Sequence, residues 1–186
     1  MDFDRDFAEA VLPDRWKAAG LRLAPFAVGH KLLLHRIGSP FATGEGTVGA
    51  AELMDAVWIC SRPYAEGVSS IGRGPGLRWK LWSALTAVRL SNPEIFKREC
   101  AAFTAYIEAA HKRPAKVRTD SEAGTTSAPF VMLLVRDLMN HHGYSFAELM
   151  EMPLRRAVFE RFGILEIDGT VSWPEPWEFG KGVPHG

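Results

Sequence analysis

The stretch NHHGYSFAELMEMP, residues 140–153, contains the signals for one helix end and two helix starts. Gly143 is placed to take the left-handed conformation that often follows the last turn of a helix. Ser145 and Glu148 have the spacing of a capping box, in which the two side chains bond backbone N–H groups at the start of a helix. Pro153 suits the first turn of the next helix. We therefore interpret this stretch as a helix junction, in which Ser145 is a cap and not a nucleophile.

Apolar residues recur at helical spacing along most of the chain, and this periodicity predicts an all-α fold. The clearest case is a helix capped by Asn92, with Pro93 at its first position. Strand signals are scarce, because no segment alternates apolar and polar residues for more than a few positions. Further helices are predicted in the first twenty residues, within 26–38, within 47–61 after a Thr47 cap, and within 77–90.

The segment LRWKLWSALTAVRL, residues 77–90, carries an apolar stripe along its predicted helix. This stripe consists of Leu81, Trp82, Leu85 and Val88. The chain as a whole has 11 Phe, 6 Trp and 6 Met residues. We expect most of these large apolar side chains to fill a helical core.

The chain is predicted to have four parts, of which two are helical. Residues 1–110 form an N-terminal helical domain, and residues 129–166 form a C-terminal helical pair that contains the junction described above. Between them, residues 111–128 hold almost no large apolar residue, which is typical of a surface linker. Residues 167–186 form a tail rich in Trp, Pro and Gly. A second, shorter connector is predicted at the glycine-rich stretch 67–76.

Charge and cysteine content disfavour several classes of protein. The 22 Lys and Arg residues balance the 22 Asp and Glu residues, so no net charge attracts nucleic acid or acidic membranes. Cys60 and Cys100 are the only cysteines, which suits a reducing compartment. The acidic N-terminus lacks the features of a signal peptide, and no apolar run reaches the roughly 18–20 residues of a membrane helix. We therefore expect a cytoplasmic protein without membrane association.

Candidate metal and nucleic-acid sites are incomplete in the sequence. Glu108 and His111 have the E-x-x-H spacing of helical di-iron proteins, but the chain contains no second copy of this motif. The adjacent residues His141 and His142 point about 100° apart on a helix, so they do not easily share one metal ion. The chain has a short basic run at 112–118 and consecutive short helices within 129–166. A helix-turn-helix there would read bases from the start of its second helix, but that start is SFAELME, which is acidic and apolar and would repel phosphate. We therefore predict no metal, no cofactor and no nucleic-acid partner.

Parts of the sequence resemble phage morphogenesis proteins. The segment VRDLMNHHGYSFAELMEMPLRRAVFERFGILE (135–166) resembles the helical region of phage tail assembly chaperones. In those proteins a helix, a Gly-aromatic-Ser/Thr turn, a Glu-hydrophobic step, a Met/Leu-Pro pair and another helix follow in this order. The segments LAPFAVGHKLLLHRIGSPF (23–41) and LMDAVWICSRPYAEG (53–67) are similar to the N-terminal helices of small phage morphogenesis proteins.

This resemblance implies a non-enzymatic phage or prophage morphogenesis factor. Tail assembly chaperones coat a long helical tape-measure protein, keep it soluble and help to recruit tail-tube subunits, which requires exposed apolar helix faces. We expect four residues to contact such a partner: Trp173 and Trp177 in the tail, and Met150 and Met152 beside the helix junction. The oligomeric state stays open, and a homo-oligomer is compatible with this role.

Two alternatives also stay open. The first is a virion structural protein, such as a head–tail connector or a tail-completion component, which would remain in mature particles. The second is a small helical enzyme that uses His30, His111 or His141 as acid–base groups. No nucleophile, base and orienting group are recognisable together in the sequence, so the enzyme is the weaker alternative.

Overall fold

The structure is a computed structural model that describes residue 10 and residues 15–73, 76–112, 118–119, 129–169 and 171–172. Most of these residues are helical, and the all-α prediction is confirmed. The strands β1 (Lys17–Ala18) and β2 (Leu21–Arg22) form a small antiparallel hairpin, and β3 (Arg118–Thr119) pairs with β4 (Val171–Ser172). The helices are α2 (Val28–Arg36), α3 (Pro40–Thr43), α4 (Ala50–Cys60), α5 (Tyr64–Arg73), α6 (Leu77–Leu90), α7 (Pro93–His111), α8 (Phe130–His142), α9 (Phe146–Glu151) and α10 (Leu154–Ile167).

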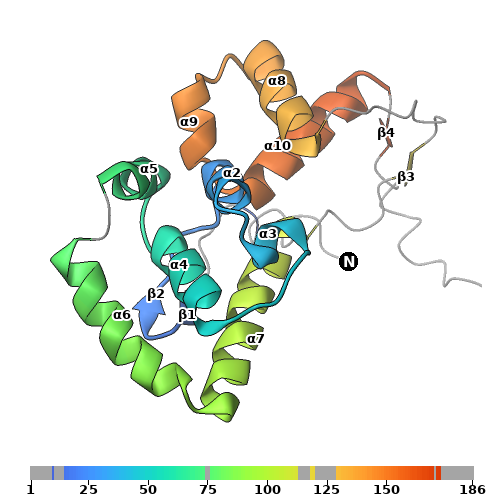
Figure 1. Cartoon of the computed structure of the whole chain (residues 1–186). Coiled ribbons are helices and arrows are strands. Elements are labelled where there is room, and N and C mark those ends of the chain that lie inside the picture. Colours follow the sequence, from blue (N-terminus) through green and yellow to red (C-terminus); the bar gives the residue numbers. More distant parts are fainter. Residues whose placement is uncertain are drawn as a thin grey trace, which may run out of the picture.

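The helices form two groups that pack on each other (Figure 1). In the first group, α4 contacts α2, α5, α6 and α7, and α6 also contacts α7. In the second group, α8 packs against α9 and α10. Contacts of α2 with α9 and of α7 with α10 join the two groups.

One hydrophobic core runs through both groups of helices. Phe103 and Tyr106 of α7 are almost completely buried, together with apolar side chains of α2, α4, α8, α9 and α10. Tyr106 Oη donates a hydrogen bond of 2.8 Å to the carbonyl of Ala24. The predicted N-terminal domain and the C-terminal helices therefore share one core, and the predicted linker lies between them in the sequence.

The starts of α2 and α10 are bonded to each other. The N–H of Val28, the first residue of α2, donates to the carbonyl of Met152 at 3.0 Å. The N–H of Leu154, the first residue of α10, donates to the carbonyl of Phe26 at 2.7 Å. The first N–H groups of a helix have no acceptor within that helix, so each of these two starts supplies an acceptor to the other.

The helix junction at 140–153 is confirmed. Helix α8 ends at His142, and Gly143 follows with a φ of +70°. The N–H of Glu148 donates to Ser145 Oγ at 3.3 Å, and the N–H of Ser145 donates to Glu148 Oε2 at 2.8 Å, which completes the capping box. Helix α10 then begins directly after Pro153.

The connector predicted at 67–76 was wrong for most of its length, because α5 continues to Arg73. Gly67 is buried inside this helix. A Cβ atom at this position would lie 3.1 Å from Leu33 Cδ1, so the glycine allows α5 to approach α2 closely. Gly67 therefore allows close helix packing and does not interrupt α5.

The start of α4 also differs from the prediction. Its cap is Gly49 and not Thr47, and the N–H of Gly49 donates to Glu52 Oε2 at 3.1 Å. Of the helix predicted in the first twenty residues, Ala10 is helical, the other residues before Arg15 lie outside the described part, and residues 17–22 form the hairpin.

Candidate partner-binding surface

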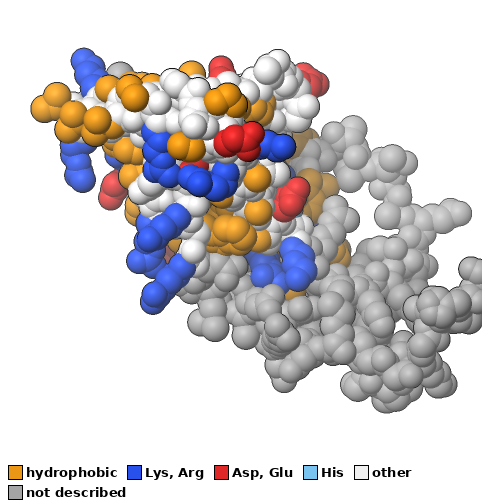
Figure 2. All heavy atoms as spheres, turned by 90° about the horizontal axis from the view of Figure 1, so that it is seen from below, with side chains coloured by type: hydrophobic (Ala, Val, Ile, Leu, Met, Phe, Trp, Pro, Cys, Tyr) orange, Lys and Arg blue, Asp and Glu red, His pale blue; other side chains and the backbone are white. Residues whose placement is uncertain are grey.

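Helix α6 turns a row of large apolar side chains toward solvent. Leu77, Leu81, Leu85 and Val88 are 82, 63, 67 and 78% exposed. Their spacing places all four on one face of the helix. Figure 2 views the molecule from the end where α6 and α7 meet, and it shows hydrophobic side chains at the surface among those of Lys and Arg. We call these four residues the α6 row.

The opposite face of α6 includes small and polar residues. Ser83, Thr86 and Leu90 are buried against the rest of the molecule. Ser83 Oγ donates to a carbonyl of its own helix at 3.1 Å, so its burial leaves no unpaired hydroxyl. The apolar stripe that the sequence predicts is therefore divided, because Trp82 turns toward the core while the other three members face outward.

Contacts along α6 hold the helix in place with the row outward. Trp82 stacks on Trp58 of α4, with ring centroids 5.3 Å apart and 25° between the ring planes. Trp82 Nε1 also donates to the carbonyl of Ala19 at 3.3 Å. At the other end, Arg89 forms an ion pair of 2.9 Å with Glu99 of α7. The exposure of the row therefore follows from how the helix is anchored.

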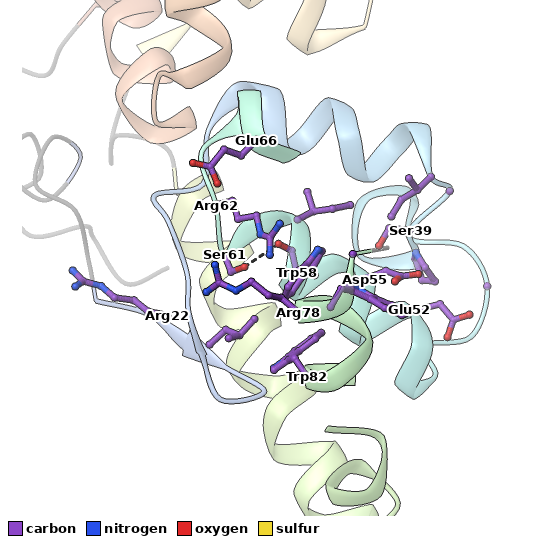
Figure 3. Close-up of a pocket in the computed structure, with 18 of the residues that line it drawn as sticks. Arg22, Ser39, Glu52, Asp55, Trp58, Ser61, Arg62, Glu66, Arg78 and Trp82 are labelled. Atoms are coloured by element: carbon purple, nitrogen blue, oxygen red, sulfur yellow. Dashed lines mark hydrogen bonds between the residues drawn. The ribbon is translucent and has the colours of Figure 1, made fainter. Parts of the chain in front are cut away.

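A cavity of about 1270 Å³ opens beside the first turn of α6 (Figure 3). Its walls come from β2, residues 37–47, α4, the turn between α4 and α5, and the start of α6. Trp58 and Trp82 give it an aromatic surface. Leu77, the first member of the α6 row, also lines it, so the cavity and the row are continuous.

Three arginines line one side of this cavity. The guanidinium carbon of Arg62 lies 3.5 Å from the centroid of the Trp58 ring, as in a cation–π contact. Arg22 and Arg78 line the same space. Burial lowers the pKa of Arg62, Glu66 partly opposes this, and the neighbouring charge of Arg78 lowers it further. Among the carboxylates that the structure describes, none is within ion-pair distance of Arg62 or Arg78.

The other side of the cavity is acidic and polar. Glu52 and Asp55 of α4 lie there, and Figure 3 shows them across the cavity from Arg62. Burial raises the pKa of the Asp55 carboxyl, and the charge of Glu52 raises it further. Ser39 lines the same side and is only 3% exposed, and its Oγ has no hydrogen-bond partner among the described residues.

Two of the three histidines considered as acid–base groups have both ring nitrogens engaged. His30 is buried, its Nδ1 accepts from the N–H three residues before it at 3.0 Å, and its Nε2 donates to the carbonyl of Arg62 at 2.7 Å. His111 Nδ1 donates to a carbonyl of α7 at 2.8 Å, and its Nε2 accepts from Lys31 Nζ at 2.8 Å. Burial lowers the pKa of both. His141 is exposed in the last turn of α8.

Within the described ranges, no three His, Cys, Asp or Glu side chains lie close enough to hold a metal ion. Cys60 is buried, Cys100 is half-buried, and both are free thiols whose pKa is raised by burial. No described helix combines the length and apolar character that crossing a bilayer requires.

Two of the four residues predicted to contact a partner, Met150 and Met152, are buried. Met150 is 1% exposed and Met152 is 6% exposed, and both belong to the core. Their burial contradicts the prediction that they form an exposed contact: Met150 belongs to α9, which packs against α2, and Met152 directly follows that helix. Trp173 and Trp177 lie outside the described residues.

Trp58 and Arg62 were not identified as site residues from the sequence. Their separation by four residues was the available signal, since this spacing places two side chains on the same face of a helix or of its continuation. An arginine four residues from a tryptophan can stack on the ring, as it does here.

Comparison of the chain with family models, with curated proteins and with solved structures finds no match.

Proposed function

We propose that this chain is a non-enzymatic protein-binding factor whose α6 row binds an apolar helix of a protein partner. The observation that carries the proposal is the exposure of four aligned apolar side chains on a firmly anchored helix. Contiguous apolar patches on soluble proteins commonly mark interaction sites. Fully burying an exposed side chain of this kind contributes about 1.5–3 kcal/mol, and the cost of association offsets part of that gain.

The dimensions of the row suit a helical partner. From Leu77 to Val88 the row extends along about 16 Å of helix axis, or about three turns. A partner helix of the same length can place side chains at i, i+4 and i+7 between those of the row, as in other helix-to-helix recognition.

The resemblance to phage tail assembly chaperones suggests the identity of the partner, a long helical protein of the tape-measure type. The segments that carry the resemblance, 23–41, 53–67 and 135–166, correspond to α2, α4, the start of α5 and α8–α10. These helices supply much of the core. Helix α6 lies outside the resemblance, and we propose that it provides the partner-binding surface on this scaffold, in the cytoplasm of the host cell.

The test is affinity capture from the native host during particle production, with the chain carrying a tag. Leu81→Ser combined with Leu85→Ser removes the centre of the row, and Ile167→Ser is a matched control because Ile167 is 84% exposed on α10. We expect one long, helix-rich partner to be recovered with the wild-type chain and with the control, and to be lost with the double variant.

Two results would redirect the proposal. Equal recovery of that partner with the double variant would show that α6 is not the binding surface. Presence of the chain in purified particles, bound to capsid or neck proteins, would favour the virion structural alternative over a chaperone, which leaves before assembly is complete.

A further inference from the structure

The cavity beside α6 adds a charged element to the apolar row. Arg62 and Arg78 both line it, Glu66 lines it nearby, and no described carboxylate lies within ion-pair distance of either arginine. Burial lowers the pKa of Arg62, the charge of Glu66 partly opposes this, and repulsion by the guanidinium of Arg78 lowers it further. A negatively charged group placed between them would be attracted by both and could accept hydrogen bonds from both.

Arg62 is held in a geometry that suits an anionic ligand. Its guanidinium stacks on Trp58 at 3.5 Å, which covers a face of the group and leaves the N–H bonds in its plane available. The backbone at Arg62 is fixed as well, because its carbonyl accepts a 2.7 Å hydrogen bond from the buried His30. The binding group is therefore positioned before a ligand arrives, which lowers the entropic cost of binding.

A second polar group on the cavity wall also points to a ligand. Ser39 Oγ is buried without a hydrogen-bond partner among the described residues. A buried hydroxyl in this state is unfavourable unless a bound group supplies the missing hydrogen bond. Figure 3 places Ser39 across the cavity from Arg62, so a segment that fills the cavity meets both.

The charges of α6 indicate whether the α6 row binds a second copy of the chain or a different, acidic protein. Arg78, Lys80 and Arg89 are its charged residues, and none is acidic. If a second copy of the chain packed its own α6 row here, cations would face cations. Charge complementarity therefore favours an acidic partner over a second copy.

We infer that the cavity binds a carboxylate of the partner, and that the partner is an acidic amphipathic helix. The carboxylate lies between Arg62 and Arg78, and the apolar face of the partner covers the row from Leu77 onward. This inference rests on the proposed function, since it assigns the partner's chemistry at the same surface.

Two synthetic peptides test it with the full-length chain. Both are amphipathic helices of about 18 residues, or five turns, with leucines at every third and fourth position. One has glutamates in its first and last turns, and the other has glutamines at the same positions. Binding is measured by fluorescence anisotropy of a dye on each peptide, with the wild type, Arg62→Gln/Arg78→Gln, Arg78→Glu and the control Lys97→Gln.

We expect the wild type and the exposed control Lys97→Gln to bind the glutamate peptide about tenfold more tightly than the glutamine peptide. The double variant is expected to bind both peptides equally. Arg78→Glu, at an exposed position where folding is not at risk, is expected to prefer the glutamine peptide. Equal affinity of the wild type for both peptides, or a preference that survives in the double variant, overturns the inference.

The same experiment separates this inference from the proposed function. If Leu81→Ser/Leu85→Ser binds the glutamate peptide as well as the wild type does, the α6 row is not the binding surface, while the carboxylate site in the cavity is still supported. If the double serine variant no longer binds either peptide and the wild type binds both with equal affinity, the α6 row is supported as the binding surface and the carboxylate site is contradicted. Absence of binding by either peptide to the wild type overturns both.

Other occupants give distinct results. A wild-type dimer in sedimentation analysis that Leu81→Ser/Leu85→Ser abolishes would assign the row to a second copy. Binding of the wild type to phosphatidylserine vesicles, with no binding to the peptides, would assign it to a membrane surface. Either result overturns the inference of an acidic helix.

Discussion

His30 Nε2 donates a hydrogen bond of 2.7 Å to the backbone carbonyl of Arg62, so a buried histidine of α2 fixes the chain at the cavity wall. The imidazole is neutral in this arrangement, because its Nδ1 accepts from the N–H of Ala27 at 3.0 Å. Burial lowers the pKa of His30 from its usual value of 6.5, against weaker effects that raise it. Protonation would break the bond to Ala27 and place a charge in the core.

We predict that the free energy of unfolding falls as the pH is lowered from about 7.5 to about 5.5. The unfolded chain takes up protons on its histidines near pH 6.5, while folded His30 stays neutral to lower pH, so protons favour the unfolded state. His111, whose pKa is also lowered, contributes in the same direction. Urea unfolding at both pH values measures the change.

His30→Gln separates the contribution of this residue, since glutamine keeps a donor in reach of the Arg62 carbonyl. We expect this variant to be less stable near neutral pH by about 1–3 kcal/mol and to lose less stability on acidification. His141→Gln, at an exposed position, is the control. A pH dependence that is unchanged in His30→Gln would show that His30 is not the main group involved.

Glu99 links three parts of the fold, and its loss is expected to be costly. The carboxylate accepts from the N–H of Ala19 at 2.8 Å, from Arg89 at 2.9 Å and from Arg98 at 3.1 Å. Burial raises its pKa, but these three interactions outweigh burial and leave the pKa lowered. We predict that Glu99→Gln costs about 2–3 kcal/mol at neutral pH in chemical denaturation.

The exposed Glu108 of the same helix supplies the control for Glu99. Glu108→Gln is expected to change stability by less than about 0.5 kcal/mol. A loss of similar size in both variants would mean that the Glu99 contacts do not tie the hairpin and α6 to α7.

Substitution of the α6 row is predicted to leave stability almost unchanged. Leu81→Ser and Leu85→Ser alter side chains that are 63 and 67% exposed, so each is expected to change the free energy of unfolding by only about 0.5 kcal/mol. Leu34→Ala, in the core at 0% exposed, is expected to cost about 2–5 kcal/mol. Thermal and urea unfolding measure the stability of all three variants. If Leu81→Ser and Leu85→Ser lost as much stability as Leu34→Ala, the α6 row would have to be buried.

Gly29 and Gly163 form a matched pair for the packing of α2. A Cβ atom on Gly29 would overlap the Tyr64 ring and lie 2.7 Å from the carbonyl oxygen of Met150, whereas one on Gly163 would meet nothing within 4 Å. We predict that Gly29→Ala destabilises the fold by about 1–3 kcal/mol. Gly163→Ala is expected to stabilise α10 by about 0.5–1 kcal/mol. Equal effects in urea denaturation would contradict the close approach of α5 and α9 to Gly29.

The features predicted correctly from the sequence are local ones. The capping box at Ser145 and the left-handed Gly143 depend on neighbouring residues alone, and they stand as predicted. The Asn92 cap does too, since its Oδ1 accepts from the N–H groups of Glu94 and Ile95. Such interactions are fixed within a few residues, so sequence spacing is enough to identify them.

The direction in which a helix faces depends on distant partners. The periodicity of α6 identified an apolar stripe, but the Trp58–Trp82 stack and the burial of Ser83 decide that Leu81 and Leu85 face solvent. The prediction that Met150 is a surface contact was wrong for the same reason. The spacing of residues within α9 does not show that this helix packs on α2 and buries Met150.

Hydrogen–deuterium exchange of the chain, alone and in the complex isolated from its host, tests the central claim most directly. The account predicts that binding slows exchange in peptides covering residues 77–90 and at the cavity wall around Arg62, while α8 and α10 exchange as in the free chain. Protection confined to α8–α10, with α6 unchanged, would contradict the assignment of the α6 row as the partner-binding surface.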